Sequence, residues 1–471
     1  MRLADLAGIG GDSRVTGFAI DHRKVAPGTV FGAFRGSLFN GEDFIPQAVS
    51  AGAVAVVARP GVPVDGAAHV AAEEPRREFA RLAAKFFQPF PETVVAVTGT
   101  NGKTSSVELT RQLWRMAGHH AASIGTLGVT TADDRTTTGL TTPDIVTFLS
   151  NMAGLAREGV SHAAFEASSH GLSQYRTEGL PVRAGAFTNF TRDHLDYHET
   201  MEAYFEAKMR LFDEVLEPGG SAVIWTDDPK SDEVIRRCGA RGLRLLTVGR
   251  RGEALKLLER EPTQLGQRLV VEAEGKSHKI ELPLIGAYQA ANALTAAALV
   301  LATGGDLART LASLGRVQGV RGRLERAVIT RAGAPVYVDY AHTPDAIEAA
   351  IAALRPHARD RLIIVFGAGG DRDVGKRAEM GATAARLADL AIVTDDNPRS
   401  EDPAAIRRDI MEGARAAREV PGRREAIAEA VAQAGPGDIV LLAGKGHEQG
   451  QVVGDKVLPF DDVTVARECA A

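Results

Sequence analysis

The stretch that decides the fold is residues 94–104, VVAVTGTNGKT. Its first four residues are apolar and mostly β-branched, which predicts a short buried strand. The glycines let the backbone turn so that its N–H groups face an anion, and a predicted helix over 105–114 adds partial positive charge at its N-terminus. Lys103 would counter phosphate charge, and Thr104 could reach a magnesium ion. The segment therefore predicts a phosphate-binding loop between a strand and a helix.

The match to the full Walker pattern is partial. That pattern has a glycine six residues before the lysine, where this chain has Val97, so only the GxxGKT half is present. A strand-to-helix turn that binds nothing is the alternative, and ATP is favoured over GTP only slightly at this point.

Composition is that of an ordinary globular chain. Its 471 residues suggest about two to four domains. The formal net charge of -5 argues against a general nucleic-acid binder, and two cysteines exclude a disulfide framework. The N-terminus has no apolar signal-peptide region. Residues 282–305 are uncharged, but Pro283, Gln289 and Asn292 interrupt them, which favours a buried helix over a membrane span.

Three domains are expected around this loop, over 1–90, 91–321 and 322–471, with a proline-containing linker at 88–91. Short apolar stretches occupy 29–34 and 53–58. Apolar runs predict strands over 163–165, 222–225, 335–339, 361–366, 390–394 and 438–443, and helices over 76–87, 151–159, 201–212, 345–354 and 379–388. Strand–helix alternation indicates parallel sheets, whose ligands gather at the carboxyl ends of the strands.

Two polar segments follow strands of the central domain, 166–171 (EASSHG) and 189–198 (NFTRDHLDYH). They are expected to meet beside the phosphate loop. Together they supply His170, His194 and His198 with Glu166, Asp193 and Asp196. Oxygen ligands suit Mg²⁺. A zinc site is the alternative, although no HExxH spacing or cysteine supports it.

Six motifs in order resemble those of the Mur ligases: GTNGKT at 99–104, EASSH at 166–170, TNFTRDHLDYH at 188–198, DYAHTP at 339–344, DNPR at 396–399 and GKGHE at 444–448. The last two look like the branch that adds the third residue of the peptide. The resemblance covers nearly the whole chain. It implies an α/β protein with an N-terminal UDP-binding domain, a central P-loop ATPase-like domain with a mostly parallel sheet, and a C-terminal Rossmann-like domain.

The resemblance also implies a reaction. ATP would phosphorylate the side-chain carboxylate of D-glutamate in UDP-N-acetylmuramoyl-L-alanyl-D-glutamate, and the amine of an incoming diamino acid would displace the phosphate. The chemistry needs positioning and charge neutralisation. The implied catalytic residues are Lys103, Glu166, His194 and Lys208. In the family a lysine carries a CO₂-derived carbamate, and Lys208 matches it; read without the family, Lys208 would be a solvated helix lysine.

Further positions carry over from the family. ATP would contact Gly99, Thr100, Asn101, Gly102, Lys103, Thr104, Asn292, Arg323 and Asp339, and Mg²⁺ would contact Thr104, Glu166, His194 and the carbamate of Lys208. The UDP-muramyl dipeptide would contact Ser13, Ser37, Thr141, Thr142, Ser168, Gln174 and Arg176. Leu140 stands where some relatives have Asn, which puts a side-chain contact there in doubt.

The expected diamino acid is meso-2,6-diaminopimelate, because DNPR is typical of the family members that add it. It would contact Arg372, Asp396, Asn397, Pro398, Arg399, Gly444 and Glu448. Arg399 offers a planar fork for the distal carboxylate. The alternative is that Arg399 anchors its loop to Glu401 or Asp402 and that the substrate is L-lysine or L-ornithine.

Two other functions are compatible with a phosphate loop of this kind. A folylpolyglutamate synthetase shares the central and C-terminal architecture but normally begins near the phosphate loop. A P-loop nucleotide switch would have no evident need of the DYAHTP, DNPR and GKGHE segments. We expect a cytoplasmic monomer that uses ATP, Mg²⁺ and small-molecule substrates, with no nucleic-acid partner and no membrane insertion.

Overall fold

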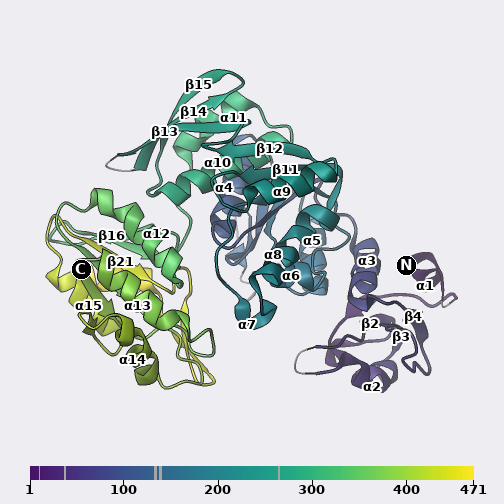
Figure 1. The fold of residues 1–471 in the computed structure, drawn as a ribbon. Coiled ribbons are helices and arrows are strands. Elements are labelled where there is room, and N and C mark those ends of the chain that lie inside the picture. Colours follow the sequence, from purple (N-terminus) through teal and green to yellow (C-terminus); the bar gives the residue numbers. More distant parts are fainter. Residues whose placement is uncertain (10, 37–38, 132–134, 137–140, 264–265) are drawn as a thin grey trace.

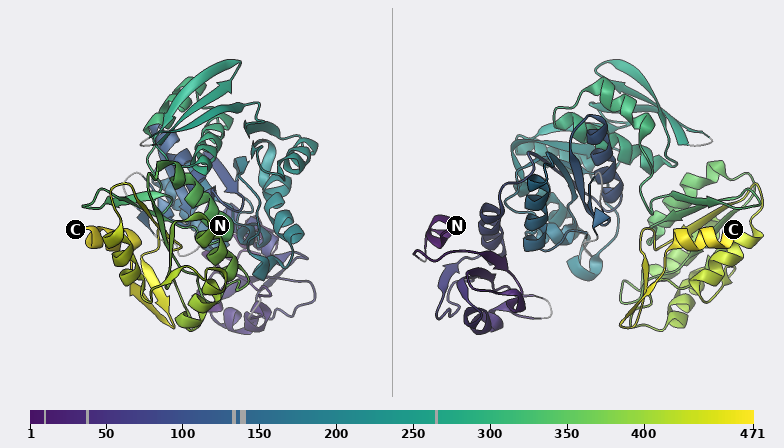
Figure 2. Two further views of the ribbon diagram at one scale, coloured as in Figure 1. Left: turned by 60° about the vertical axis from the view of Figure 1, so that its left-hand side comes forward. Right: turned by 180° about the vertical axis from the view of Figure 1, so that it is seen from behind.

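The computed structural model describes residues 1–471 except 10, 37–38, 132–134, 137–140 and 264–265. It contains three α/β units, each built on its own sheet (Figure 1). The central unit lies between the other two, as the view from behind also shows (Figure 2). The α/β class and the mostly parallel central sheet predicted from the sequence are confirmed.

The N-terminal unit is a parallel sheet of four strands in the order β1-β2-β3-β4. Phe79 is fully buried and packs edge-on against Phe18 and Phe34, with ring centroids 5.2 and 5.3 Å apart, so α3 closes the core. The elements are α1 (Leu3–Ala7), β1 (Gly17–Ala19), β2 (Thr29–Gly32), α2 (Ile45–Ser50), β3 (Ala53–Ala58), β4 (Ala68–Ala71) and α3 (Pro75–Phe87).

The central sheet has eleven strands, in the order β15-β14-β13-β12-β11-β10-β5-β9-β6-β7-β8. All six residues of β5 are buried, because α4 and α10 cover one face of the sheet while α5 and α8 cover the other. The strands are β5 (Thr93–Thr98), β6 (Ala121–Gly125), β7 (Gly128–Thr130), β8 (Arg135–Thr136), β9 (His162–Glu166), β10 (Val182–Phe187), β11 (Leu216–Trp225), β12 (Arg244–Gly249), β13 (Leu255–Thr263), β14 (Gly266–Ala273) and β15 (Lys276–Leu282). The helices are α4 (Lys103–Met116), α5 (Ile145–Arg157), α6 (Ser169–Ser173), α7 (Leu195–His198), α8 (Met201–Arg210), α9 (Ser231–Ala240), α10 (Ala287–Ala302) and α11 (Leu307–Ser313).

Two sequence expectations for this unit need correction. The helix predicted over 151–159 begins at Ile145, because Asp144 caps it by accepting hydrogen bonds from the backbone of Val146 and Thr147. The antiparallel strands β13 to β15 at the sheet edge were not predicted. The uncharged stretch 282–305 contains α10, and among the described residues no helix is long and apolar enough to cross a membrane.

The C-terminal unit has a six-stranded sheet in the order β16-β17-β21-β18-β19-β20, parallel except for β16. The strand predicted over 335–339 is β17 with the same bounds, because its alternating Val and Tyr side chains are buried. The strands are β16 (Glu325–Ile329), β17 (Pro335–Asp339), β18 (Leu362–Phe366), β19 (Leu390–Val393), β20 (Arg418–Glu419) and β21 (Ile439–Ala443), with a separate hairpin of β22 (Gly450–Val453) and β23 (Lys456–Pro459). The helices are α12 (Pro344–Leu354), α13 (Lys376–Leu387), α14 (Pro403–Gly413), α15 (Arg423–Gln433) and α16 (Asp462–Ala470).

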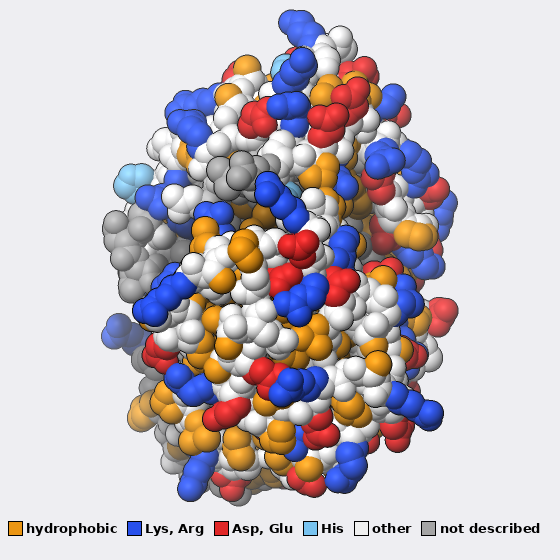
Figure 3. Space-filling model, turned by 90° about the vertical axis from the view of Figure 1, so that its left-hand side faces the viewer, with side chains coloured by type: hydrophobic (Ala, Val, Ile, Leu, Met, Phe, Trp, Pro, Cys, Tyr) orange, Lys and Arg blue, Asp and Glu red, His pale blue; other side chains and the backbone are white. Residues whose placement is uncertain are grey.

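The face that carries the C-terminal unit presents basic and acidic side chains interspersed with one another (Figure 3). The chemistry-bearing segments instead lie where the carboxyl ends of the central and C-terminal strands approach each other, since β5, β9, β17, β19 and β21 all end in or just before a motif.

Candidate active site

The phosphate loop joins the end of β5 to the start of α4. Gly99 and Gly102 have φ values of +142° and +84°, which glycine adopts readily. A side chain at Gly99 would collide with Thr188, and one at Gly102 would collide with Asn292. Both glycines are therefore required by backbone conformation and by close packing.

Lys103 folds back over this loop. Its Nζ atom donates hydrogen bonds to the carbonyl oxygens of Gly99 and Thr100 at 2.9 and 2.7 Å. Burial lowers the pKa of Lys103, although the charges of Glu166 and Asp193 oppose this shift. The lysine is thus held at the loop, where a phosphate would displace its carbonyl partners.

Lys208 lies against the same loop from α8. Its side chain is 1% exposed and its Nζ atom donates to the carbonyl oxygen of Gly99 at 2.8 Å. Burial and the neighbouring charge of Lys103 lower the pKa of Lys208 well below its ordinary value. Its reading as a solvated helix lysine is therefore wrong.

Glu166 ends β9 on the other side of the loop. Its carboxylate accepts hydrogen bonds from the backbone N and the hydroxyl of Thr126 at 2.7 and 3.2 Å. It is 2% exposed, so the charge is available only to groups bound at the loop.

The predicted histidines form an edge-to-face aromatic group next to these residues. The ring of His170 lies 4.9 Å from that of His194 and 5.4 Å from that of His198. Burial lowers the pKa of both His194 and His198 to about 4, so both rings are neutral at neutral pH and can donate a nitrogen lone pair. Burial raises the pKa of Asp193, but the charges of His194, His342 and Lys376 outweigh it and the net shift is downward.

A magnesium ion fits this donor set only with help from a nucleotide. The described residues contain no group of three or more His, Cys, Asp or Glu side chains that could hold a metal ion by themselves. The hydroxyl of Thr104 accepts a hydrogen bond from Arg323 at 3.1 Å. Mg²⁺ characteristically binds a few protein groups together with water and phosphate oxygens. The small number of protein donors at the phosphate loop is consistent with this mode of binding.

A cavity of about 400 Å³ adjoins the loop and receives residues from the central and C-terminal units. The predicted nucleotide residues Asn292, Arg323 and Asp339 all line it, although they lie on α10, in the connection to β16 and at the end of β17. Burial raises the pKa of Asp339, whose carboxylate accepts hydrogen bonds from Leu324 N and the Tyr288 hydroxyl. The apolar wall of this cavity includes Trp225, Ala287 and Ala291, which suits the base of a nucleotide.

A second, polar cavity of about 360 Å³ lies between the central and C-terminal units. It brings together predicted residues of three kinds: Thr141, Thr142, Ser168 and Arg176 for the muramyl substrate, His194 for the metal, and Arg372, Asp396, Asn397, Arg399, Gly444 and Glu448 for the amino acid. Sequence reasoning missed Lys376 and gave His342 no role, although both line the cavity. The position of Lys376, four residues after Arg372, was the available signal.

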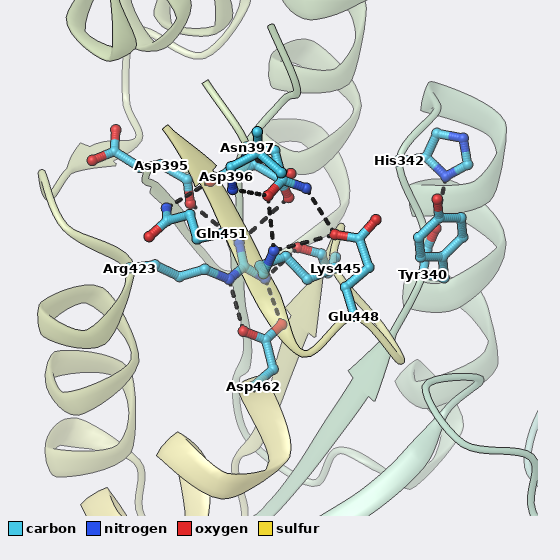
Figure 4. Close-up of polar contacts among 12 residues, drawn as sticks. Tyr340, His342, Asp395, Asp396, Asn397, Arg423, Lys445, Glu448, Gln451 and Asp462 are labelled. Carbon is cyan, nitrogen blue, oxygen red and sulfur yellow. Dashed lines mark hydrogen bonds and ion pairs between the residues drawn. The ribbon is translucent and has the colours of Figure 1, made fainter. Parts of the chain in front are cut away.

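Arg399 occupies a left-handed conformation with φ +52° and donates to the carbonyl oxygen of Gly370 at 2.7 Å. Arg399 is therefore anchored to this backbone oxygen and not to Glu401 or Asp402, the partners that the alternative named. Arg377 instead pairs with Glu401 at 2.8 Å, and Asp402 caps α14. The guanidinium of Arg399 thus lines the polar cavity together with Asn397 and Glu448 (Figure 4 shows the latter two).

The residues predicted to bind the muramyl dipeptide lie in different surroundings. The hydroxyls of Thr142 and Ser168 lie 2.9 Å apart, and Arg176 donates to the carbonyl of Thr142 at 2.7 Å. Gln174 contacts the Tyr197 hydroxyl at 2.9 Å. Ser13 is exposed and does not line the N-terminal cavity described below; Ser37 and Leu140 lie outside the described residues.

A third cavity, of about 600 Å³, opens in the N-terminal unit. His22 and Phe44 stack there with centroids 4.4 Å apart and an interplanar angle of 2°. Arg76 lines the same cavity, with its guanidinium 4.8 Å from the centre of the Phe34 ring. Sequence analysis did not identify these residues, because none of them lies in a motif.

Comparison with known proteins agrees with this geometry. The model of the Mur ligase middle domain matches residues 97–300, and that of the Mur ligase glutamate ligase domain matches residues 322–446. The chain is 60% identical over 461 residues to the UDP-N-acetylmuramoyl-L-alanyl-D-glutamate–2,6-diaminopimelate ligase of Zymomonas mobilis subsp. mobilis, covering 97% of this chain and 95% of that protein. It is 50% identical over 475 residues to the ligase of the same name from Bradyrhizobium diazoefficiens, covering 98% and 97%.

Solved structures give the same result. A UDP-N-acetylmuramoyl-L-alanyl-D-glutamate–2,6-diaminopimelate ligase matches with a TM-score of 0.73 and 32% identity, covering 100% of this chain and 98% of that one. The Mycobacterium tuberculosis folylpolyglutamate synthase, at 20% identity and a TM-score of 0.66 over 84% of this chain and 93% of that one, shares the fold alone. The fold and the phosphate loop therefore define an ATP-dependent ligase. The chain belongs to the Mur ligase family.

Proposed function

We propose that this chain joins an amine of meso-2,6-diaminopimelate to the D-glutamate side-chain carboxylate of UDP-N-acetylmuramoyl-L-alanyl-D-glutamate, with hydrolysis of ATP to ADP and phosphate. The observation that carries the proposal is that Tyr340 lines both the nucleotide cavity and the polar cavity. A phosphoryl group at the loop is therefore next to the space that would hold a carboxylate and an amine. The names of the most similar relatives support the same reaction.

The reaction proceeds in two balanced steps. A carboxylate oxygen of D-glutamate attacks the γ-phosphorus of ATP, which forms an acyl phosphate and releases ADP. The neutral amine then attacks the acyl carbon, the C–N bond forms, phosphate leaves and the amine loses one proton. Lys103 and the N-terminus of α4 stabilise the phosphate charge, and Asp193 and His342 line the cavity where that proton is released.

The predicted ligands fit a magnesium ion that is also bound by phosphate. Thr104, Glu166, His194 and a carbamylated Lys208 would hold it, and it would supply charge neutralisation for phosphoryl transfer. Carbamate formation requires a neutral amine, which adds to CO₂ with loss of a proton. The burial of Lys208 and its lowered pKa support that modification.

Recognition of the diamino acid is assigned to Arg372, Asp396, Asn397, Pro398, Arg399, Gly444 and Glu448, and recognition of the muramyl dipeptide to Thr141, Thr142, Ser168, Gln174 and Arg176. The stacked rings of His22 and Phe44 make the third cavity a candidate site for the uracil end of the substrate.

With these binding roles, the three proposed domains span 1–90, 91–321 and 322–471. We also propose that the protein works as a monomer in the cytoplasm, because one chain contains all three cavities and ATP is available there.

The test is phosphate release with ATP, Mg²⁺ and UDP-muramyl dipeptide, comparing meso-diaminopimelate with L-lysine and L-ornithine. Release that requires the dipeptide and is strongest with diaminopimelate is expected. Strongest release with lysine or ornithine would keep the ligase and overturn the choice of amino acid. Release that needs neither substrate would favour the nucleotide switch.

A further inference from the structure

Lys445 belongs to the GKGHE segment, yet the reaction above gives it no role. Its side chain is fully buried behind the polar cavity. Its Nζ atom lies 3.2 Å from Asn397 Oδ1, 3.2 Å from Glu448 Oε2 and 2.6 Å from the carbonyl oxygen of Gly450 (Figure 4). Its three N–H donors thus have three acceptors, two of which belong to residues that line the cavity.

Lys445 helps to fix the orientation of the Asn397 amide. Asn397 Oδ1 accepts from Lys445 and also from the backbone N of Val452 at 2.9 Å, which uses both of its lone pairs. Asn397 Nδ2 donates to Glu448 Oε2 at 2.7 Å. A reversed amide would turn its NH₂ group toward an ammonium and an N–H group, so the network permits one orientation only.

The neighbouring buried cation does not share this task. Arg423 forms a two-bond pair with Asp462, at 2.7 and 2.6 Å, and both side chains are 0% exposed. Its guanidinium stays 3.8 Å from Asp396 (Figure 4). The charge of Arg423 is therefore balanced by Asp462, and Lys445 is the buried cation that balances Glu448.

We propose that Lys445 is a positioning residue that sets the polarity of the amino-acid pocket and so selects diaminopimelate over lysine. This inference rests on the proposed function. With the amide held by Lys445, Asn397 presents N–H and Glu448 presents its second carboxylate oxygen. Together with Arg399, this pairs a donor side with an acceptor side, which matches the carboxylate and the ammonium that diaminopimelate, unlike lysine, has on one carbon at the end distal to the attacking amine. Without Lys445 only the Val452 N–H and Glu448 hold the amide, so the reversed orientation, which presents the amide oxygen to the substrate carboxylate, becomes less unfavourable.

The test uses Lys445→Met and Lys445→Gln in the full chain. Lys456→Met is the matched control, because Lys456 is exposed in the adjoining hairpin. For Lys445→Met the KM for diaminopimelate should rise roughly tenfold or more, as for a lost hydrogen bond to a charged group, and the kcat/KM preference over L-lysine should fall. Acyl-phosphate formation, trapped with hydroxylamine in the absence of any diamino acid, should match the wild type. Lys445→Gln keeps one hydrogen-bond donor for Asn397. Its KM for diaminopimelate and its preference over L-lysine should therefore lie between those of the wild type and of Lys445→Met.

A double-mutant cycle with Asn397→Ala adds a readout that a merely structural role would not give. If Lys445 acts through Asn397, the two effects on KM will not add. Unchanged KM and preference in folded Lys445→Met, or an equal loss in hydroxylamine trapping, would overturn the inference. If Lys445→Met does not fold, Lys445→Gln decides by the same criteria. A wild-type enzyme without preference for diaminopimelate would instead overturn the proposed function, which is measured first.

Discussion

The Nζ atom of Lys208 donates a hydrogen bond to the carbonyl oxygen of Gly99 at 2.8 Å and thereby joins α8 to the phosphate loop. The same carbonyl oxygen accepts from Lys103 at 2.9 Å. Two lysines, of which Lys208 is fully buried, therefore converge on one backbone oxygen. Conversion of one of them into an anion would turn this repulsive arrangement into an attractive one.

Lys208→Ala is expected to lower ligase activity about 100-fold, because a metal-binding oxygen donor is lost. Formate or acetate should restore part of the activity by filling the space with a carboxylate. Lys230→Ala is the control, since that lysine is half exposed and pairs with Glu233. ¹³C NMR of the wild type in ¹³CO₂ should show one carbamate signal that Lys208→Ala lacks. A wild-type enzyme without this signal would contradict the assignment.

Arg399→Ala is expected to raise the KM for diaminopimelate about 100-fold, since a two-bond contact between guanidinium and carboxylate is lost. The KM for ATP should not change. Arg408→Ala, an exposed arginine on α14, serves as the control. Steady-state kinetics with each substrate varied in turn decides the matter, and full diaminopimelate activity in Arg399→Ala would remove the basis for the choice of amino acid.

His22→Ala is expected to raise the KM for the UDP-muramyl dipeptide about tenfold, because half of the aromatic stack with Phe44 is removed. The exposed His120 provides the matched control, His120→Ala. Titration with UDP alone, followed by calorimetry, isolates the N-terminal cavity from the chemistry. Equal UDP affinity in His22→Ala and wild type would place the uracil elsewhere.

Protein stability should fall as the pH drops from about 6.5 to about 4, partly through His162. Burial, followed by the charges of His119 and Arg183, lowers its pKa to about 4 from an ordinary value of 6.5. The unfolded chain binds the proton first in this window, so acid favours unfolding by up to about 3 kcal/mol. His162→Phe keeps a ring against Trp114 and removes the titration. Its melting temperature should fall less than that of the wild type between pH 7 and pH 4, and parallel curves would refute the role of His162.

Much of this arrangement could be predicted because it is local. The strand, the glycines and the helix of the phosphate loop are contiguous in sequence, and the polar Asn292 in an uncharged helix pointed to a buried contact. The strand 335–339 has the predicted bounds, and the apolar stretch 53–58 is a strand with those bounds, because the apolar residues of each are consecutive.

Contacts between distant segments could not be predicted. Asn397 meets Glu448 and Val452 across more than fifty residues, and no periodicity signals that a separate hairpin will pair with the DNPR segment. Lys376 becomes a candidate only when the central and C-terminal units are brought together, and Arg76 only when α3 packs against the N-terminal sheet, because each is an ordinary helix residue in sequence. Ser13 is a different case. The family resemblance named it as a contact of the UDP-muramyl dipeptide, and in the structure it lies exposed on the surface.

The hydrogen bond between Arg323 and Thr104 spans 219 positions and connects the segment between α11 and β16 to the phosphate loop. Arg323 lies just before β16, the first strand of the C-terminal sheet. The segment that leads into this sheet therefore contacts the phosphate loop directly. A magnesium ion bound by the Thr104 hydroxyl would compete with Arg323 for it, so we expect this hydrogen bond to break when the loop is filled. Occupancy of the loop would then alter a direct contact between the central unit and the segment that leads into the C-terminal sheet.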